Sequence, residues 1–224
     1  TQRAGNFLVA RAPSDHFSWN DLKGKAVLGG RKGGMPEMVF EYVLKQNGID
    51  PTVDLSIDQS IDFGSTAAAF SGGSGDYTVE FEPGATALES EGSGYVVASL
   101  GVDSGYVPYT AFSAKQSYLD KNAGTVQSFT NALQKGMNYV SAHTPEEIAA
   151  VIAPQVPDTD SATLTTIISR YYGQDTWKTD LIFSEDSYEL LLTILDDAGE
   201  LSEKPDYAAL VCTDFARAAA DSVK

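Results

Sequence analysis

The stretch Tyr77–Leu100 reads YTVEFEPGATALESEGSGYVVASL. Its two ends, Tyr77–Phe81 and Tyr95–Leu100, are rich in the aromatic and β-branched residues that favour strands. Between them, Glu82-Pro83-Gly84 opens a helix that is expected to run through Leu88. A strand, a helix and a second strand joined by short connections are typical of an α/β sheet.

The same alternation extends back towards the N-terminus. Apolar runs predict further strands, and segments with proline or acidic residues at the start and glycine at the end predict helices. The expected strands are Phe7–Ala10, Ala26–Gly29 and Val53–Ile57, and the expected helices are Pro36–Leu44, closed by Gly48, and Thr66–Phe70. The first part of the chain is therefore predicted to form an α/β sheet that is mostly parallel.

After about Phe112 the pattern becomes mainly helical. Val126, Phe129, Leu133 and Met137 recur at helical spacing, and Thr144-Pro145-Glu146-Glu147 forms a capping box with proline at the first helical position. Further helices are expected over 164–171, 188–195 and 215–223. These helices have apolar faces but few strands to cover, so either they pack on one another or the sheet that they would cover is missing.

Charge and composition exclude several classes of protein. The 224 residues carry 31 acidic against 15 basic side chains, a net charge of −16. Such a surface repels nucleic acid and anionic lipid, so neither is an expected partner. One cysteine, Cys212, and two histidines, His16 and His143, cannot form a disulfide or a three-histidine zinc site. We therefore expect no metal and no cofactor.

The glycine-rich stretches do not match nucleotide-binding motifs. Gly29–Gly34 is followed by Met35 and not by Lys-Ser/Thr, and no Gly-x-Gly-x-x-Gly occurs. Ser74 and Ser104 lack the glycines of a nucleophile elbow. No catalytic pattern is present, so the sequence is predicted not to be an enzyme.

Three segments taken together resemble one family. Residues 19–25 read WNDLKGK, 30–37 read GRKGGMPE and 76–83 read DYTVEFEP. With residues 105–112 and the helix of 122–139, they resemble solute-binding proteins of ABC importers, in the branch for thiamine-precursor pyrimidines, sulfonates, taurine and nitrate. The resemblance covers essentially the whole chain.

The resemblance implies a type II periplasmic-binding fold, in which two α/β lobes close on a ligand. Residues 1–12 would be a crossover strand, 13–106 the complete second lobe, and 107–224 the hinge return and the C-terminal, mainly helical part of lobe one. The chain would cross between lobes near Leu8–Ala12 and Val107–Phe112. Members begin with about 90 further residues, the size of a small lobe. Without them, either the missing part is supplied separately or a dimer or a segment swap covers the exposed helix faces.

The resemblance places a ligand-binding site at the ends of the strands. Between a strand and a helix N-terminus, the backbone N–H groups of Gly33, Gly34 and Met35 could bind an anionic or polar ligand, or the glycines could merely form a tight turn. Pro36 belongs to the same segment. Arg31 could pair with a sulfonate or carboxylate, or remain in solvent.

A second set of candidates follows the strand at 77–81 and the second crossing. Phe81 ends that strand, and Glu82 could accept hydrogen bonds from a ligand amine or complement the helix N-terminus. Tyr109 could stack on a flat ring such as a pyrimidine or pack in the hinge. Thr110 lies beside it, where both lobes meet.

The function implied is capture without chemistry. The protein would be the extracytoplasmic solute-binding component of an ABC importer, tethered to the membrane through a segment before residue 1, and would deliver a small molecule to a permease. Two alternatives remain: an enzyme of the same family that makes the thiamine pyrimidine, disfavoured by the single cysteine, and a ligand-sensing module of a receptor. A fragment that has lost binding is a third.

Overall fold

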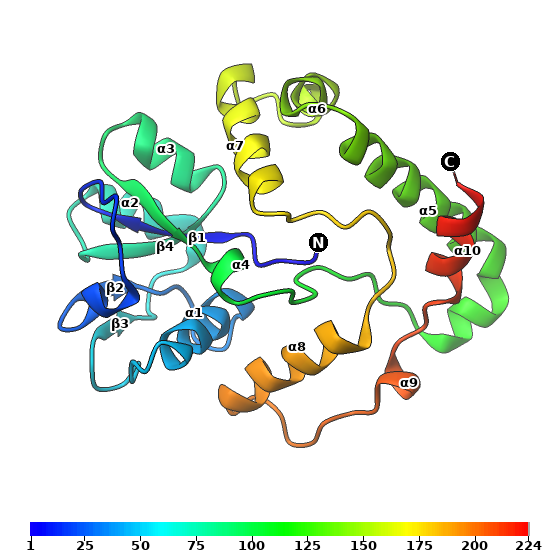
Figure 1. Cartoon of the computed structure of the whole chain (residues 1–224), viewed down its shortest axis with the longest axis horizontal. Coiled ribbons are helices and arrows are strands. Elements are labelled where there is room, and N and C mark those ends of the chain that lie inside the picture. The colour runs from blue at the N-terminus through cyan, green and yellow to red at the C-terminus, as the bar shows by residue number, and fades with distance from the viewer. Residues whose placement is uncertain (224) are drawn as a thin grey trace.

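A computed structural model describes residues 1–223. It consists of a sheet flanked by helices, formed by the first half of the chain, and an arc of helices formed by the second (Figure 1). The chain begins near the centre of the view, between the two regions. Among the described residues, no helix is both long and apolar enough to cross a membrane.

The sheet is mixed, because β1 runs in the opposite direction to the other four strands. Its strands are β1 (Asn6–Ala10), β2 (Ala26–Leu28), β3 (Ser56–Asp58), β4 (Tyr77–Phe81) and β5 (Tyr95–Ser99), in the order β3-β2-β4-β1-β5. β2 pairs in parallel with β3 and β4, whereas β1 pairs antiparallel with β4 and β5. β2 to β5 thus share one direction, but the prediction of a mostly parallel sheet is wrong around β1. No βαβ crossover joins β1 to its neighbours, so nothing forces it to run parallel to them.

The strand expected at Val53–Ile57 is also misplaced. The structure has a turn over this region, and β3 begins only at Ser56. Oδ1 of Asp50 accepts hydrogen bonds from the backbone and the hydroxyl of Thr52, while Oδ2 of Asp54 accepts from the backbone N–H of Asp50. Aspartate side chains that bond nearby backbone groups favour turns over strands.

Helices cover both faces of the sheet, because side chains alternate along each strand. α1 (Met35–Gln46) covers the face that carries Leu8 and Val79. α2 (Phe63–Ser71) and α3 (Gly84–Ser90) cover the other face, which carries Phe7 and Val9. All four of these strand residues are at most 2% exposed. The sheet is therefore a packed, two-sided core, and its strand ends are held firmly.

The second half forms the arc of helices around the open side of Figure 1. Its helices are α5 (Gln116–Ala142), α6 (Pro145–Ile152), α7 (Ser161–Gly173), α8 (Glu185–Asp197), α9 (Tyr207–Leu210) and α10 (Asp214–Ser222), with the short α4 (Leu100–Asp103) leading from the sheet. Two 3-10 turns, η1 (Trp19–Leu22) and η2 (Ala153–Gln155), complete the elements. The capping box at Thr144 is present as expected.

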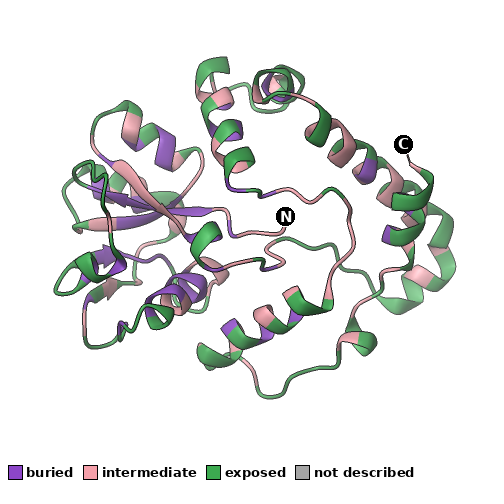
Figure 2. Ribbon diagram, in the orientation of Figure 1, coloured by how far each residue is buried: buried purple, intermediate pink, exposed green. Residues whose placement is uncertain are grey.

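The arc is much less buried than the sheet (Figure 2). In α5, the long helix, Gln134 is the one buried residue. A small core of Ile148, Ala149, Leu164 and Ile168 joins α6 to α7. The helices thus pack partly on one another, and the side of α5 that carries Phe129 stays exposed.

Candidate ligand-binding site

The carboxyl ends of β2 and β4 form the point of the sheet at which its connections diverge. From β2 the chain passes through α1 to β3 on one side, and from β4 it passes through α3 to β5 on the other. In open α/β sheets, ligands bind in the crevice at such a switch point. Two predicted segments lie there: Arg31–Pro36 follows β2, and Phe81–Glu82 ends and follows β4.

The loop after β2 approaches its neighbours closely. Gly30 has φ +74°, and a Cβ at this position would lie 2.2 Å from Cζ of Phe63, so only glycine fits. Gly34 is the N-cap of α1 and has no side chain to cap it, and Met35 begins the helix. The first N–H groups of α1 therefore have no acceptor within the helix. Arg31 is exposed at the rim of this loop.

Three aromatic rings meet at the end of β4. The Phe81 ring meets Phe63 edge-on at a centroid distance of 5.6 Å and lies 6.2 Å from the ring of Tyr109. The hydroxyl of Tyr109 is buried and has no hydrogen-bond partner among the described residues. Burial and, to a lesser extent, nearby Tyr171 raise the pKa of Tyr109, so the phenol is neutral and available as a donor.

Asn6 is a further candidate that the sequence analysis missed. It faces Phe81 across the β1–β4 pair and is fully buried. Its Nδ2 donates to the carbonyl of Pro36 at 3.3 Å, while its Oδ1 has no partner among the described residues. A polar residue at the start of the apolar run Phe7–Ala10 was the one available signal. Buried polar atoms without partners are rare, so this oxygen needs an explanation.

Glu82 is engaged by the protein itself. Its carboxylate pairs with Arg170 of α7 and accepts from the backbone N–H and the hydroxyl of Thr86, at 3.0 and 2.9 Å. Its side chain is 2% exposed. Of the two interpretations of Glu82, complementing the N-terminus of α3 is the one for which contacts are present. Thr110 is exposed, and its Oγ1 accepts from the N-terminal ammonium of Thr1 at 3.0 Å.

A segment of the arc contacts the start of the chain and Tyr106, whereas the crossing expected near Leu8–Ala12 overlaps β1 of the sheet. The residues that lead into β1 are hydrogen-bonded to the segment after α7. Gln2 N donates to the carbonyl of Thr176 at 2.9 Å, and Nε2 of Gln174 donates to the carbonyl of Ala4 at 3.1 Å. The hydroxyl of Tyr106 donates to Asp175 at 2.7 Å. These contacts join distant parts of the sequence, so no local pattern could have indicated them.

Two buried carboxyl groups lie close to this end of the sheet. Glu37, in the first turn of α1, is 3% exposed, and Glu80 of β4 is 2% exposed. Burial is the main cause that raises the pKa of each to about 7. Thr78 donates to Glu80 at 2.6 Å. Both acids therefore change charge near neutral pH.

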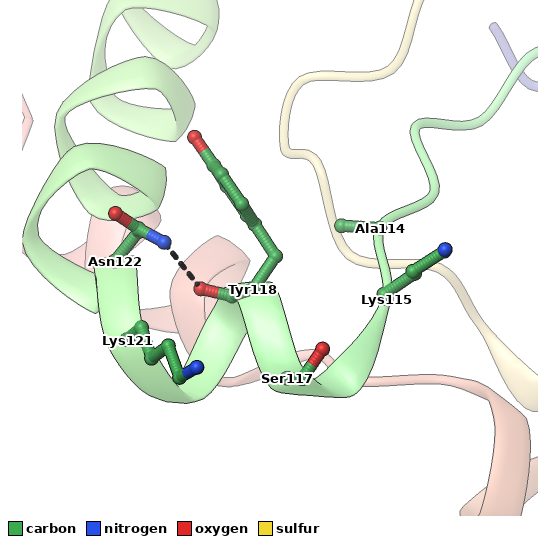
Figure 3. Close-up of a pocket in the computed structure, with 6 residues that line it drawn as sticks. All are labelled: Ala114, Lys115, Ser117, Tyr118, Lys121 and Asn122. Atoms are coloured by element: carbon green, nitrogen blue, oxygen red, sulfur yellow. Dashed lines mark hydrogen bonds between the residues drawn. The ribbon is translucent and has the colours of Figure 1, made fainter.

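Two hollows lie elsewhere on the surface. One, of about 460 Å³, is formed by residues 114–122 at the start of α5, and the other, of about 280 Å³, lies between β5 and α7. In the first, Lys115, Tyr118 and Lys121 point in different directions (Figure 3). A binding site needs convergent polar groups, which this hollow lacks. Neither hollow includes a residue predicted for the site. Within residues 1–223, no cluster of three or more His, Cys, Asp or Glu could hold a metal ion.

Comparison with known proteins gives one family and one fold. The profile of the NMT1-like family matches residues 15–153. "Putative binding protein YtlA" of Bacillus subtilis (strain 168) is 47% identical over 216 residues, which are 96% of this chain. The chain spans 65% of the length of that relative.

The solved structures agree on the fold. The periplasmic aliphatic sulphonate binding protein SsuA of Escherichia coli superposes with a TM-score of 0.70 at 16% identity, over 97% of this chain and 72% of SsuA. The desulfurization enzyme DSZB superposes with a TM-score of 0.61 at 12% identity, over 98% of this chain and 77% of the enzyme. The predicted α/β, periplasmic-binding-protein-like fold is confirmed, as is the resemblance to solute-binding proteins. The assignment of individual residues to the site stays a prediction, as do the lobe boundaries at 12 and 106.

Proposed function

The chain belongs to the NMT1-like family, and from that premise we propose that it is the solute-binding component of an ABC importer. It captures a small polar or anionic molecule at the carboxyl ends of β2 and β4, with the arc of helices closing over it. The relatives named as binding proteins, at the level of sequence and of fold, support this assignment. Ligand then favours the closed arrangement by its greater affinity for it.

One observation carries the proposal: two buried polar atoms without partners belong to residues next to Phe81, at the end of β4. They are Oδ1 of Asn6, an acceptor, and the hydroxyl of Tyr109, a donor. An unmet buried polar group costs about 1–3 kcal/mol, and a ligand that bonds it recovers that cost. The pair therefore favours binding of a molecule with a donor and an acceptor beside a flat or apolar part.

This chemistry ranks the ligand classes. Asn6 holds its amide nitrogen against Pro36, so a ligand must donate to the free oxygen. An aminopyrimidine and taurine have N–H donors, whereas nitrate and a simple alkanesulfonate have none. The aromatic rings favour a planar ligand, and the N–H group of Met35 at the start of α1 favours an acceptor or an anion, since Gly33 and Gly34 already donate to Glu37 and Arg31. We propose an amino-bearing ligand of the pyrimidine or taurine class.

Native mass spectrometry of the purified chain and calorimetric titration test the proposal. The titrated probes are 4-aminopyrimidine, taurine, ethanesulfonate and nitrate. Taurine and ethanesulfonate differ in the amine alone, so binding of the first and not the second supports a donor to Asn6. Tyr109→Phe keeps the ring and should weaken binding about tenfold, the worth of one hydrogen bond. Tyr118→Phe, at an exposed position on α5, is the control.

Two results would count against the proposal. A chain that retains no small molecule and binds none of the four probes contradicts a binding function for residues 1–224. Ethanesulfonate or nitrate binding as tightly as taurine contradicts the ranking of ligands while leaving capture intact.

The remaining assignments concern the whole protein, because the chain spans part of its relatives. A membrane permease is the proposed partner, and the proposed location is extracytoplasmic, with a tether outside residues 1–224. The dimer or segment swap stays a prediction. Sedimentation velocity at several concentrations tests it, since a self-associating chain sediments faster as its concentration rises.

Capture is favoured over catalysis by the groups at the site. Its aromatic rings and amide are suited to holding a ligand, and Cys212 lies between α9 and α10, on the arc and away from the strand ends (Figure 1). DSZB shows that this fold also hosts an enzyme. Turnover of a bound probe would therefore contradict the proposal. A receptor module would bind the same probes and would be identified by the domain fused to it.

A further inference from the structure

Glu37 connects two loops at the strand ends. Its carboxylate is buried in the first turn of α1. Oε2 accepts from the backbone N–H of Gly33 at 3.1 Å, and Oε1 accepts from Nε2 of Gln59 at 2.5 Å. Gly33 belongs to the loop between β2 and α1, and Gln59 belongs to the loop between β3 and α2. One side chain thus holds both loops.

The strands under these loops are fixed, but the loops themselves are exposed. β2 and β3 pair up to Leu28 and Asp58, and Gly29 N donates to the carbonyl of Asp58 at 3.0 Å. Beyond that bond, residues 31–33 are exposed, and the loop's own backbone bond is Gly34 N to the carbonyl of Arg31 at 3.2 Å. Few contacts other than those of Glu37 order this loop.

We propose that Glu37 is a positioning residue: by holding Gly33 and Gln59 together it fixes the direction in which the first N–H groups of α1 face a ligand. A helix N-terminus binds a polar group well only when its N–H groups are already aligned. The inference rests on the proposed function, because the two loops matter as the walls of a ligand site.

Protonation of Glu37 is expected to loosen the link. The ionised carboxylate accepts from both partners through charge-assisted bonds, whereas a protonated carboxyl has only weaker neutral bonds and can reach Gln59 only if that amide turns its oxygen inward. The charged groups that face it are Glu41 on the same helix and Lys32 in the loop. Glu200 approaches Gly33 from beyond α8. With the pKa of Glu37 at about 7, the loop should be better ordered at pH 8 than at pH 6.

Hydrogen exchange of the ligand-free chain tests the proposal. Glu37→Met has no acceptor oxygen and keeps neither bond, whereas a glutamine could keep both by donating to the oxygen of a turned Gln59 amide. We expect amides of residues 30–34 to exchange at least about tenfold faster than in the natural chain at pH 8, as loss of a hydrogen bond to a charged group implies. The amides of β1 and β4 should be unchanged. Rates are normalised to the intrinsic rate at each pH.

Two further variants make the test specific. Gln59→Met removes the other partner and leaves Glu37 in place, so it should loosen residues 59–62 even where Glu37→Met folds poorly. Glu146→Gln, at an exposed position on α6, serves as the control. The difference in loop exchange between pH 6 and pH 8 should disappear in Glu37→Met, which a general loss of stability would not produce.

The outcomes separate this inference from the proposed function. Loop exchange that is equal in Glu37→Met and the natural chain, or faster exchange spread evenly over β1 and β4, overturns the inference. Loosened loops together with weaker binding of 4-aminopyrimidine or taurine support it. Loosened loops in a chain that binds no probe support the positioning role of Glu37 and contradict the proposed function.

Discussion

At the scale of single residues, Gly30 and Gly24 distinguish two costs of replacing glycine. One is the backbone strain of a positive φ, and the other is a clash of the added Cβ with a neighbour. Both have φ near +75°, but a Cβ at Gly24 would meet nothing within 4 Å, whereas at Gly30 it would strike Phe63. Gly24→Ala should therefore cost about 1–2 kcal/mol, the backbone term. Gly30→Ala should cost a further 1–3 kcal/mol, roughly, because Phe63 must move. Urea unfolding measures both, and equal costs would contradict the close contact.

Glu80 makes stability depend on pH. In the unfolded chain its pKa is near 4.5, and in the folded chain burial raises it to about 7. The folded state thus holds the proton more tightly, so the contribution of Glu80 is full below pH 4.5 and is lost as pH rises through 7.

Glu80→Gln should remove the loss of stability that Glu80 causes as the pH rises. Glutamine stays neutral and can still accept from Thr78. Relative to the natural chain, the variant should gain about 3 kcal/mol between pH 4.5 and pH 8, as 2.5 pKa units imply. Unfolding at both pH values measures the gain, with Glu203→Gln at an exposed position as the control. If the free energy of unfolding differs between the variant and the natural chain by the same amount at both pH values, Glu80 is not a buried carboxyl that titrates in this range.

Sequence reasoning reached the location of the candidate site but not its polar contacts. The ends of the strands at 26–29 and 77–81 led to Gly33–Pro36 and to Phe81, and the structure places both segments at the switch point. It could not show that Asn6 faces Phe81, because that pairing depends on a strand far away in the sequence. In the sequence, Glu37 was only one of the acidic residues that mark the start of a helix.

At the scale of elements, one side chain ties α7 to α3. Arg170 pairs with Glu82 and Glu89, donates to the hydroxyl of Thr86 at 3.0 Å, and lies 5.4 Å from the ring centre of Phe7. Since Glu82 is nearly fully buried, removing its partner leaves an uncompensated charge.

We therefore expect Arg170→Met to destabilise the chain by about 3 kcal/mol. Adding Glu82→Gln should recover part of that loss, because no buried charge then remains. Lys204→Met breaks a pair with Asp196 that is half exposed and should change stability by less than about 1 kcal/mol. Thermal unfolding of the four proteins compares them. Equal effects of Arg170→Met and Lys204→Met would show that the link is not buried in solution.

Elements with strong local signals were predicted well. The strand Tyr77–Phe81 has its expected bounds, and Thr144 caps α6 through its own side chain. β3 was misplaced because alternation over 53–57 mimics a strand, while the side chains of Asp50 and Asp54 form a turn there. Short side chains that compete for the backbone can thus outweigh a hydrophobic pattern.

At the scale of the whole molecule, stability should be uneven. Every residue of β1 is buried, whereas α5 has one buried residue. Hydrogen bonds from Gln127 to the carbonyl of Phe215 and from Asn138 to the carbonyl of Val223 connect α5 to the C-terminal segment that contains α10. Segments with few buried contacts open locally at low cost. Amides of α5 should exchange on the order of 100-fold faster than those of β1 and β4. Equal protection of α5 and the strands would contradict this prediction. The same measurement on a longer form of the protein would show whether additional residues protect α5.

The change of character near residue 112 was visible in the sequence, but the way the two regions meet was not. Gln174 and Thr176 bond the segment before β1 through contacts that span most of the chain. Local periodicity carries no information on such pairings, and only the family resemblance indicated the overall arrangement.

The antiparallel strand β1 also bears on how the chain is made. Phe7 and its neighbours leave the ribosome before Glu80, Phe81 and Ser99, the residues with which this strand pairs. Until those residues emerge, the apolar run Phe7–Ala10 has no partner strand in this sheet, and such distant pairings form slowly. Apolar segments that stay exposed in this way during synthesis favour aggregation.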